Sequence, residues 1–432
     1  ARVLNGFGFE PILKQKPEDL SGGQMQIANL ACAMAAEPEL LLLDEPTTFL
    51  DSYHKKMFLD YLTALHKGGL TILHITQFPD EAAQASRICI LDDGMLISDS
   101  VPDNIWDNEE FINKHRLLPP ERLRFRKKFG FDWNDNVAAK VFSQNLKTQG
   151  KRKEPENTDP VNKCVLSVRD LRFSYQNNKF NLSIDKLNFA KGEIIGLVGA
   201  TGSGKSTLAF LLSGLLEPDS GAITYSGKLL SDYSIKELRG KIGITWQLPD
   251  LAMIGPTVKE DIEFNLEGNI DIPSILDRVG FDGFEERIVD TLSGGEKRKL
   301  CLAVVLAANP DFVILDEPTA FLDPVSQREF LNIVKGFSQE GRGVIIAGHD
   351  LNFISEVADR IIGIKDGTIM FDIIAAKFFS DQSYLRALEL PSDPVIGFRQ
   401  LLTESGYPLQ FESLAPERIW EELVNQYSKS ID

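Results

Sequence analysis

The chain has 432 residues, 43% of them hydrophobic and 25% charged, and a formal net charge of −17 at pH 7. This length and composition predict a globular protein of two or three domains. The acidic charge argues against a nucleic-acid partner, because binding to phosphates needs clustered lysines and arginines. No apolar run approaches the ~20 residues that span a bilayer, and no signal peptide is visible, so we expect any membrane role to depend on partners.

The cysteines and the first residues of the chain carry two further expectations. The cysteines lie far apart without the spacing of a metal site, which predicts reduced and buried thiols in a cytosolic protein: Cys32, Cys89, Cys164 and Cys301. The chain opens on "RVLNGFGFEPIL", which reads as the interior of a domain, so we expect the sequence to be a fragment.

The first motifs of the chain recur later at a constant offset. "LSGGQ" at Leu20 recurs as "LSGGE" at Leu292, and "LLLLDEPTTFLD", ending at Asp51, recurs as "FVILDEPTAFLD", ending at Asp323. The offset is 272 residues in both cases (292 − 20 and 323 − 51). A constant offset of this size predicts two copies of one fold. The second copy begins near Val165, so on the order of a hundred residues of the first copy would precede Ala1.

A basic run and a polar segment separate the two copies. The run "RLRFRKKFGF", 122–131, fits either a solvated helical face or a contact with lipid headgroups or another subunit. The segment "KTQGKRKEPENTDPVNK", 147–163, has the glycine, proline and charge content of a solvated linker.

The second copy contains a glycine loop in the context of a phosphate-binding site. In "EIIGLVGATGSGKSTLAFLL", 193–212, an apolar strand precedes the loop and a helical pattern follows it, as in a P-loop. Such glycines turn backbone N–H groups toward phosphates at a helix N-terminus. Lys205 is expected to reach the β- and γ-phosphates, and Ser206 to bind Mg²⁺.

Further candidate residues follow strand-like runs of the same copy. "FVILDEP" ends in two carboxylates, of which Asp316 would support Mg²⁺ and Glu317 would orient or deprotonate the attacking water. "VIIAGHD" ends in His349, and Gln247 follows the run in "GITWQLPD".

These motifs, in this order, resemble the ATP-binding-cassette (ABC) ATPases. More narrowly, "LAMIGPTVKEDIEFN", 251–265, and the tail from Leu388 to Val424 resemble the ATPase subunits of energy-coupling-factor (ECF) importers, in tandem form. The first copy's "LLPPERLRFRKKFGF", 117–131, looks like a shortened version of that tail. The segment "LPDLA" after Gln247 and the "SDPV" insertion in the tail depart from the ECF pattern.

The resemblance implies an α/β fold with two P-loop cassettes, each with a RecA-like core and a helical subdomain. The expected domains are an incomplete first cassette at 1–113, a shortened extension and linker at 114–163, a complete cassette at 164–378 and a helical extension at 379–432.

The resemblance also assigns roles to the motif residues. In the family, ATP lies between the P-loop of one cassette and the signature "LSGG" of the other. The expected ATP-binding residues are Tyr175 against adenine, Gly199, Gly202, Ser203, Gly204, Lys205, Ser206 and Thr207 in the loop, and Ser21, Gly22, Gly23 and Gln24 in the signature. Glu317, His349 and Gln247 would be catalytic, with Ser206, Gln247 and Asp316 at Mg²⁺.

The second composite site is expected to be degenerate. The switch histidine is replaced by glutamine, since His349 minus 272 is Gln77, whereas His74 is expected to be a packing residue. This site would contain Asp44, Glu45, Gln77, Ser293, Gly294 and Gly295. Its signature has Glu296 where glutamine is usual.

The resemblance further implies an ATPase that energises import of a small solute, a vitamin or a metal ion, from the cytoplasmic face of the cell membrane. Its cofactors would be ATP and Mg²⁺, and its partners a transmembrane scaffold and a membrane substrate-binding subunit, besides pairing of its own two cassettes. Scaffold helices would dock beside Gln247 to Glu263, where Asp250, Glu260, Asp261 and Glu263 could attract arginines. The alternatives are a soluble ABC ATPase acting on ribosomes or DNA and a non-hydrolysing scaffold. The substrate is not encoded in this chain.

Overall fold

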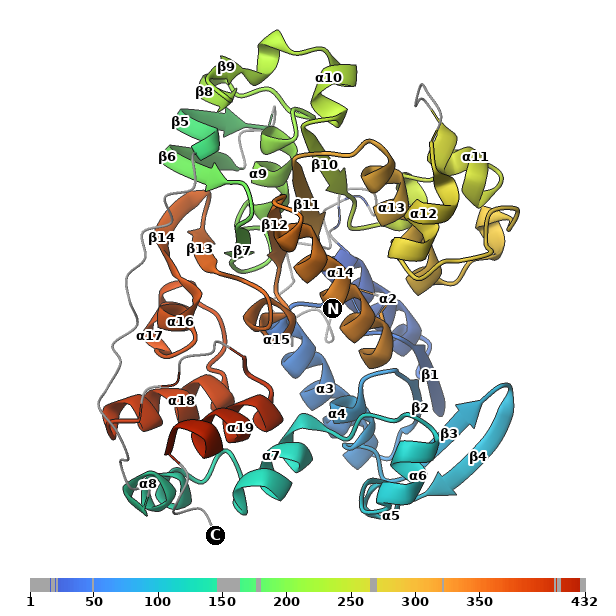
Figure 1. Ribbon diagram of the computed structural model, residues 1–432. Helices are drawn as coiled ribbons and strands as arrows, with labels where there is room; N and C mark the ends of the chain where they lie inside the picture. Colours follow the sequence, from blue (N-terminus) through green and yellow to red (C-terminus); the bar gives the residue numbers. More distant parts are fainter. Residues whose placement is uncertain are drawn as a thin grey trace. The chain divides into compact units, whose positions relative to one another are not determined.

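A computed structural model of the protein describes residues 16, 20, 22–48, 50–145, 164–175, 180–264, 270–320, 322–407, 409 and 413–427. These residues form two compact units, 1–133 and 134–432 (Figure 1). The boundary lies inside the 114–163 segment, so that segment contributes to both units. Residues 146–163 of the expected linker lie outside the described residues.

The first unit alternates helices and strands. Its elements are α2 (Gly22–Ala35), β1 (Leu40–Asp44), α3 (Ser52–Lys67), β2 (Thr71–Ile75), α4 (Pro79–Ala82), β3 (Ile88–Asp92), β4 (Met95–Ser100), α5 (Pro102–Trp106), α6 (Glu109–Lys114) and α7 (Glu121–Phe129). Strand β1 pairs in parallel with β2, and β3 pairs antiparallel with β4. The basic run forms α7, whose Phe125 and Phe129 are buried while Lys127 forms an ion pair with Glu109.

The second unit is built on one ten-stranded sheet in the order β10-β11-β12-β7-β13-β14-β6-β5-β8-β9. Its strands are β5 (Cys164–Ser174), β6 (Asn181–Ala190), β7 (Ile194–Val198), β8 (Ser220–Tyr225), β9 (Lys228–Leu229), β10 (Ile242–Thr245), β11 (Phe312–Asp316), β12 (Gly343–Gly348), β13 (Arg360–Lys365) and β14 (Thr368–Ile374). Strands β10, β11, β12, β7 and β13 are parallel neighbours, and β11, β7 and β12 are buried along their whole length. Such continuous apolar strands are typical of parallel sheets covered on both faces.

Helices cover the sheet and form a group beside it. The helices of this unit are α8 (Asn136–Asn145), α9 (Lys205–Leu212), α10 (Ile235–Arg239), α11 (Val258–Glu263), α12 (Ile272–Arg278), α13 (Gly294–Ala307), α14 (Pro324–Gln339), α15 (Leu351–Ser355), α16 (Ala375–Phe378), α17 (Ser383–Ala387), α18 (Pro394–Glu404) and α19 (Pro416–Tyr427). Leu208, Leu211 and Leu212 of α9 belong to the buried core of the sheet. Helices α11 and α12 pack on α13, as Figure 1 shows at the right of the sheet.

The C-terminal helices pack on α8. The Phe142 ring lies near the rings of Phe398 and Trp420, with centroids 6.1 and 6.4 Å away. Arg399 of α18 is buried and donates hydrogen bonds to the carbonyl oxygens of Phe379 (3.1 Å) and Ser413 (2.9 Å). These contacts fold the segment after residue 379 onto α8.

Several helices and strands of the first unit begin and end at a constant sequence offset from elements of the second unit. Helix α2 begins and ends 272 residues before α13, and the same offset relates β1 to β11 and α3 to α14. The offset becomes 273 at the β3–β4 turn, where Gly94 (φ 75°) matches Gly367 (φ 74°). The matching strands differ in burial, since Leu40 and Leu42 of β1 are exposed whereas Phe312 and Ile314 of β11 are buried.

The expectation of buried thiols is wrong for three of the four cysteines. Cys32, Cys89 and Cys164 are exposed, and Cys301 is buried. Burial raises the pKa of the Cys301 thiol to about 12. The exposed cysteines lie on helix and strand faces that the neighbouring elements leave uncovered, a property that residue type alone does not decide.

Candidate functional site

The candidate residues of the second unit follow four neighbouring parallel strands. Gly199 comes directly after β7, Asp316 ends β11, His349 comes directly after β12, and Gln247 lies two residues after β10. The carboxyl ends of parallel strands meet at one edge of a sheet, which is where ligands bind in open α/β folds. The fold therefore brings these residues to one edge, although they are spread over 150 residues of sequence (349 − 199).

The glycine loop is shaped for close approach of its backbone to a ligand. A Cβ atom on Gly199 would lie 2.2 Å from the Ile364 carbonyl oxygen, and Gly204 has a φ of 109°, so neither position accepts a side chain without strain. At Gly202, with a φ of 82°, a Cβ would meet nothing within 4 Å. Lys205 is buried and donates to the carbonyl oxygens of Gly199 (2.8 Å) and Ala200 (3.1 Å). These two hydrogen bonds hold the loop around the Lys205 ammonium group.

The end of β11 meets the start of α9 at a site suited to a cation. The Ser206 hydroxyl donates to Asp316 Oδ1 at 3.1 Å, and Asp316 is 1% exposed. Burial raises the pKa of Asp316 to about 6, and the neighbouring Glu317 carboxylate acts in the same direction. A buried carboxylate beside a serine oxygen provides the hard oxygen donors that Mg²⁺ prefers, and a bound cation would compensate its charge.

Glu317 and His349 form a close pair. His349 Nδ1 lies 2.9 Å from Glu317 Oε2, and Glu317 has a left-handed backbone with a φ of 48°. Burial by itself would raise the pKa of Glu317, but His349 and Lys205 outweigh it and lower that pKa. Burial likewise opposes the charged imidazole, but Glu317 raises the pKa of His349. His349 thus favours the ionised form of Glu317, and Glu317 favours the protonated form of His349. A strained backbone at such a pair is common at functional sites.

Tyr175 lies beside the glycine loop. Its hydroxyl is 3.3 Å from the Thr207 hydroxyl, and its ring packs edge-on against Phe173 with centroids 5.0 Å apart. The Tyr175 side chain is exposed.

The two signature segments differ in charge. Ser293 caps α13 in a capping box with Glu296, whose carboxylate also contacts Arg287 at 2.9 Å. Gly294 and Gly295 are the first residues of that helix. In the first unit, Gly22, Gly23 and Gln24 begin α2, whereas Ser21 lies outside the described residues. Glu296 puts a negative charge at a helix N-terminus that would otherwise favour an anion, and the neutral Gln24 does not.

The matching residues of the first unit have other surroundings. Asp44 is exposed at the end of β1, and Glu45 has a φ of 43°, close to that of Glu317. Burial, Glu81 and Asp44 raise the pKa of Glu45, and Gln77 contributes a backbone hydrogen bond that opposes them. His74 also lowers the pKa of Glu45, but among the described residues Glu45 forms no ion pair with a histidine like that between Glu317 and His349.

Sequence reasoning did not predict a network of hydrogen bonds and ion pairs around the buried Glu81, which lies near Glu45 in the first unit. Glu81 is 3% exposed and accepts hydrogen bonds from the hydroxyls of Thr47 (2.6 Å) and Thr76 (2.9 Å). Lys55 Nζ lies 2.6 Å and His74 Nε2 3.3 Å from its carboxylate oxygens. In the second unit, Phe353 stands 272 residues after Glu81 (353 − 81). An acidic residue that corresponds to an apolar one at this offset was the signal available in the sequence.

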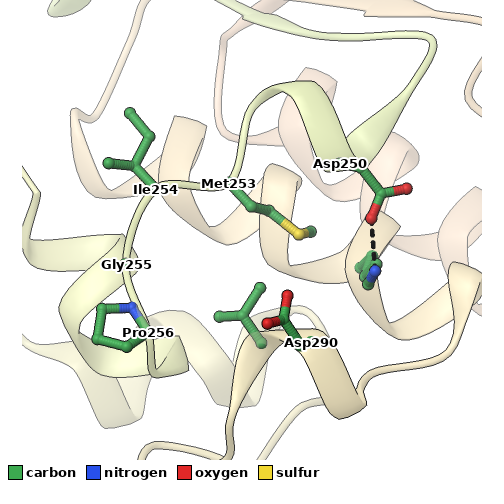
Figure 2. A pocket seen from close by; sticks show the side chains of 8 residues that line it. Asp250, Met253, Ile254, Gly255, Pro256 and Asp290 are labelled. Carbon is green, nitrogen blue, oxygen red and sulfur yellow. Dashed lines mark hydrogen bonds and ion pairs between the residues drawn. The ribbon is translucent and has the colours of Figure 1, made fainter.

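A cavity of about 260 Å³ lies at the segment that follows Gln247 in the chain, from Asp250 to Pro256. It is lined by Asp250, Met253, Ile254, Gly255, Pro256, Val289, Asp290 and Lys297 (Figure 2). Asp250 forms an ion pair with Lys297 at 2.5 Å. The expectation that Asp261 attracts a partner's arginines is wrong, because Asp261 is 3% exposed and accepts hydrogen bonds from the backbone N–H groups of Ile254 and Gly255, both at 2.7 Å. It supports the wall of the cavity instead.

A P-loop at the carboxyl edge of a parallel sheet, next to a strand-end acidic pair and a histidine, defines a nucleotide-binding ATPase domain. The family described as "ABC transporter" matches residues 1–48 and 182–320. A putative ABC transporter ATP-binding protein of Methanosarcina mazei is 30% identical over 401 residues, covering 86% of this chain and 68% of its own length. The energy-coupling factor transporter ATP-binding protein EcfA2 of Methanospirillum hungatei is 36% identical over 252 residues, covering 56% and 63%.

A solved structure is also similar: cbiO1 of Clostridium perfringens, described as part of the ABC transporter complex cbiONQ, has a TM-score of 0.47 and 30% identity and covers 55% of this chain and 99% of its own. The chain belongs to the ABC transporter ATP-binding proteins and is an ATPase of that family. Within the described residues, the longest helices are too short or too polar to span a bilayer.

Proposed function

We propose that this chain is a tandem ABC ATPase that energises import of a small solute through ECF-type membrane partners. Three observations support the duplication: the constant 272-residue offset of the motifs, the matching bounds of α2 and α13, and the match of one family to two separate stretches. The similarity to an energy-coupling factor ATPase over 252 residues supports the importer type.

The proposed competent site hydrolyses ATP at the P-loop of the second copy. The contact between Glu317 and His349 at 2.9 Å, at the edge that holds Lys205, is the observation that carries this proposal. Lys205 leaves the loop carbonyls to bind the β- and γ-phosphates, and the loop amides hold the remaining phosphate oxygens. The exposed Tyr175 ring packs against adenine in this proposal.

Ser206, Asp316 and Gln247 hold Mg²⁺ in this proposal. When bound by these residues, the ion would supply positive charge to the β- and γ-phosphates. Glu317 orients the attacking water and accepts its proton; before the reaction, His349 favours the ionised form of Glu317 by lowering its pKa. His349 contacts the γ-phosphate with its other ring nitrogen, since Nδ1 already faces Glu317.

The first copy's signature, Ser21 to Gln24, completes this site across the paired cassettes. The reciprocal site contains Asp44, Glu45 and Gln77 together with Ser293 to Gly295, and it binds nucleotide without turnover. Two features support the asymmetry: the ion pair between Glu317 and His349 has no counterpart at Glu45 among the described residues, and Glu296 adds negative charge at the second signature.

Serine substitutions in the full-length protein test this assignment. Removing one donor to a developing phosphate charge costs on the order of 10²-fold in turnover, so we expect that loss for Ser21→Ala. Ser293→Ala, the matched control, is expected to change turnover less than about threefold, because its site does not turn over. Equal losses in the two variants would contradict the asymmetric assignment.

The cavity lined by Asp250 to Pro256 and Val289 to Asp290 is the proposed docking place of a scaffold helix. It combines apolar walls at Met253, Ile254 and Pro256 with the carboxylates of Asp250 and Asp290, which suits a helix with an apolar face and a basic side chain (Figure 2).

Co-purification tests both the proposed membrane partner and its proposed docking at this cavity. We expect the chain to be recovered with a polytopic membrane protein. Recovery with ribosomes instead would favour the soluble alternative. Ile254→Asp is expected to reduce recovery of the membrane partner, whereas Leu215→Asp, an exposed residue of the same unit outside the cavity lining, should not.

A further inference from the structure

Arg298 is a buried cation that the motif assignment leaves without a role. It lies in the second turn of α13, five residues after the signature serine, and is 0% exposed. A fully buried arginine costs several kcal/mol of desolvation unless its donors are satisfied, so its contacts indicate what it stabilises.

The contacts of Arg298 are on the segment that carries Gln247. Its Nη1 donates to the Trp246 carbonyl oxygen at 2.6 Å, and its Nη2 donates to the Gln247 carbonyl oxygen at 2.9 Å. The planar guanidinium thus spans two consecutive peptide carbonyls, a geometry that lysine cannot reproduce with two fixed donors.

Neighbouring residues of α13 hold the same segment. Lys297 Nζ forms an ion pair with Asp250, and the Cys301 thiol donates to the Pro249 carbonyl oxygen at 3.8 Å. On its other side, the Trp246 ring lies 5.3 Å from the Phe210 ring of the P-loop helix α9. The segment 246–250 is therefore held between α13 and α9.

We propose that Arg298 is a positioning residue for Gln247. It fixes the backbone from which the Gln247 side chain reaches Mg²⁺ and water, and this inference rests on the role proposed for Gln247 above. Because the same helix begins at Ser293, the contact also ties the Mg²⁺ side of one ATP site to the signature of the reciprocal site.

The first copy offers the natural substitution for a test. Gln26 stands at the position of Arg298 (298 − 272), so Arg298→Gln converts the second copy to the residue of the first. Arg399→Gln is the matched control, because Arg399 is also buried and also donates to two carbonyl oxygens, at Phe379 and Ser413 in the C-terminal helices.

The readout is the Mg²⁺ concentration that gives half-maximal ATPase activity, measured with nucleotide affinity in EDTA and with thermal unfolding. Loss of a residue that orients a metal ligand typically costs 10- to 100-fold in metal affinity or activity, so Arg298→Gln should raise that concentration at least tenfold. Arg298→Lys should recover part of the shift. Arg399→Gln should destabilise the fold by a similar amount and leave the Mg²⁺ dependence unchanged.

The variant Gln247→Ala distinguishes a failure of the role proposed for Gln247 from a failure of the role proposed for Arg298. If it leaves the Mg²⁺ dependence unchanged, the role proposed for Gln247 is wrong, and the inference about Arg298 fails with it. If it shifts the dependence and Arg298→Gln does not, only the inference about Arg298 is overturned. Activity losses in both arginine variants that simply follow their melting temperatures would also overturn it.

Discussion

Replacing Glu81 should destabilise the first unit by an amount that follows from its surroundings. Burial raises the pKa of Glu81, but His74 and Lys55 outweigh that effect and lower it from 4.5 to about 2. This lowering of the Glu81 pKa corresponds to about 3 kcal/mol of stability at neutral pH. Because the folded-state pKa is depressed, this contribution is present above pH 4.5 and is lost as the pH falls toward 2.

Glu81→Gln removes the charge and keeps the size of the side chain. Hydrogen exchange resolved by mass spectrometry in β2 and α3 measures opening of the first unit within the intact chain. We expect the opening free energy to fall by about 3 kcal/mol at pH 7, and to lose most of its pH dependence between pH 4.5 and 2. Glu109→Gln breaks an exposed ion pair of the same unit with Lys127 and should cost less than about 1 kcal/mol. Equal effects of the two variants, or an unchanged pH dependence in Glu81→Gln, would refute the reasoning.

Three further predictions concern the second unit. Glu317→Gln should lower turnover by about 10²- to 10⁴-fold while ATP binding persists, and a loss below tenfold in single-turnover assays would exclude Glu317 as the base. His349→Gln, which installs the residue found at Gln77, should lower the rate of the chemical step without weakening nucleotide binding; an unchanged rate would contradict its contact with the γ-phosphate. Burial raises the pKa of Asp316 to about 6, so this carboxylate becomes protonated as the pH falls below 6. The apparent Mg²⁺ affinity, measured by titration calorimetry, should then fall by up to tenfold per pH unit. The variant Asp316→Asn should abolish this pH dependence.

The chemistry of the candidate site was largely predictable from the sequence. A glycine loop between an apolar strand and a helix, and a carboxylate pair at the end of another strand, require particular residues at fixed spacing. Such local requirements are visible without coordinates. The family match bears out the class of enzyme that those motifs predict.

The surroundings of the motif residues were not predictable, because they depend on contacts between distant segments. Asp261 looks like a surface carboxylate in the sequence, but the backbone of Ile254 and Gly255 turns back onto it. The charged residues Glu81 and Arg298 would be assigned to the surface from residue type, and only their partners on other elements explain their burial.

The amino-acid sequence by itself determined which groups are candidates for binding a nucleotide: Lys205, Ser206, Asp316, Glu317 and His349 are specified by local patterns. Only the tertiary structure decided that the strands preceding them stand in the order β11-β12-β7, which differs from their order in the chain. That order places Ser206 against Asp316 and His349 against Glu317. The pKa values follow from it, because burial and the nearest charge are properties of three-dimensional neighbours.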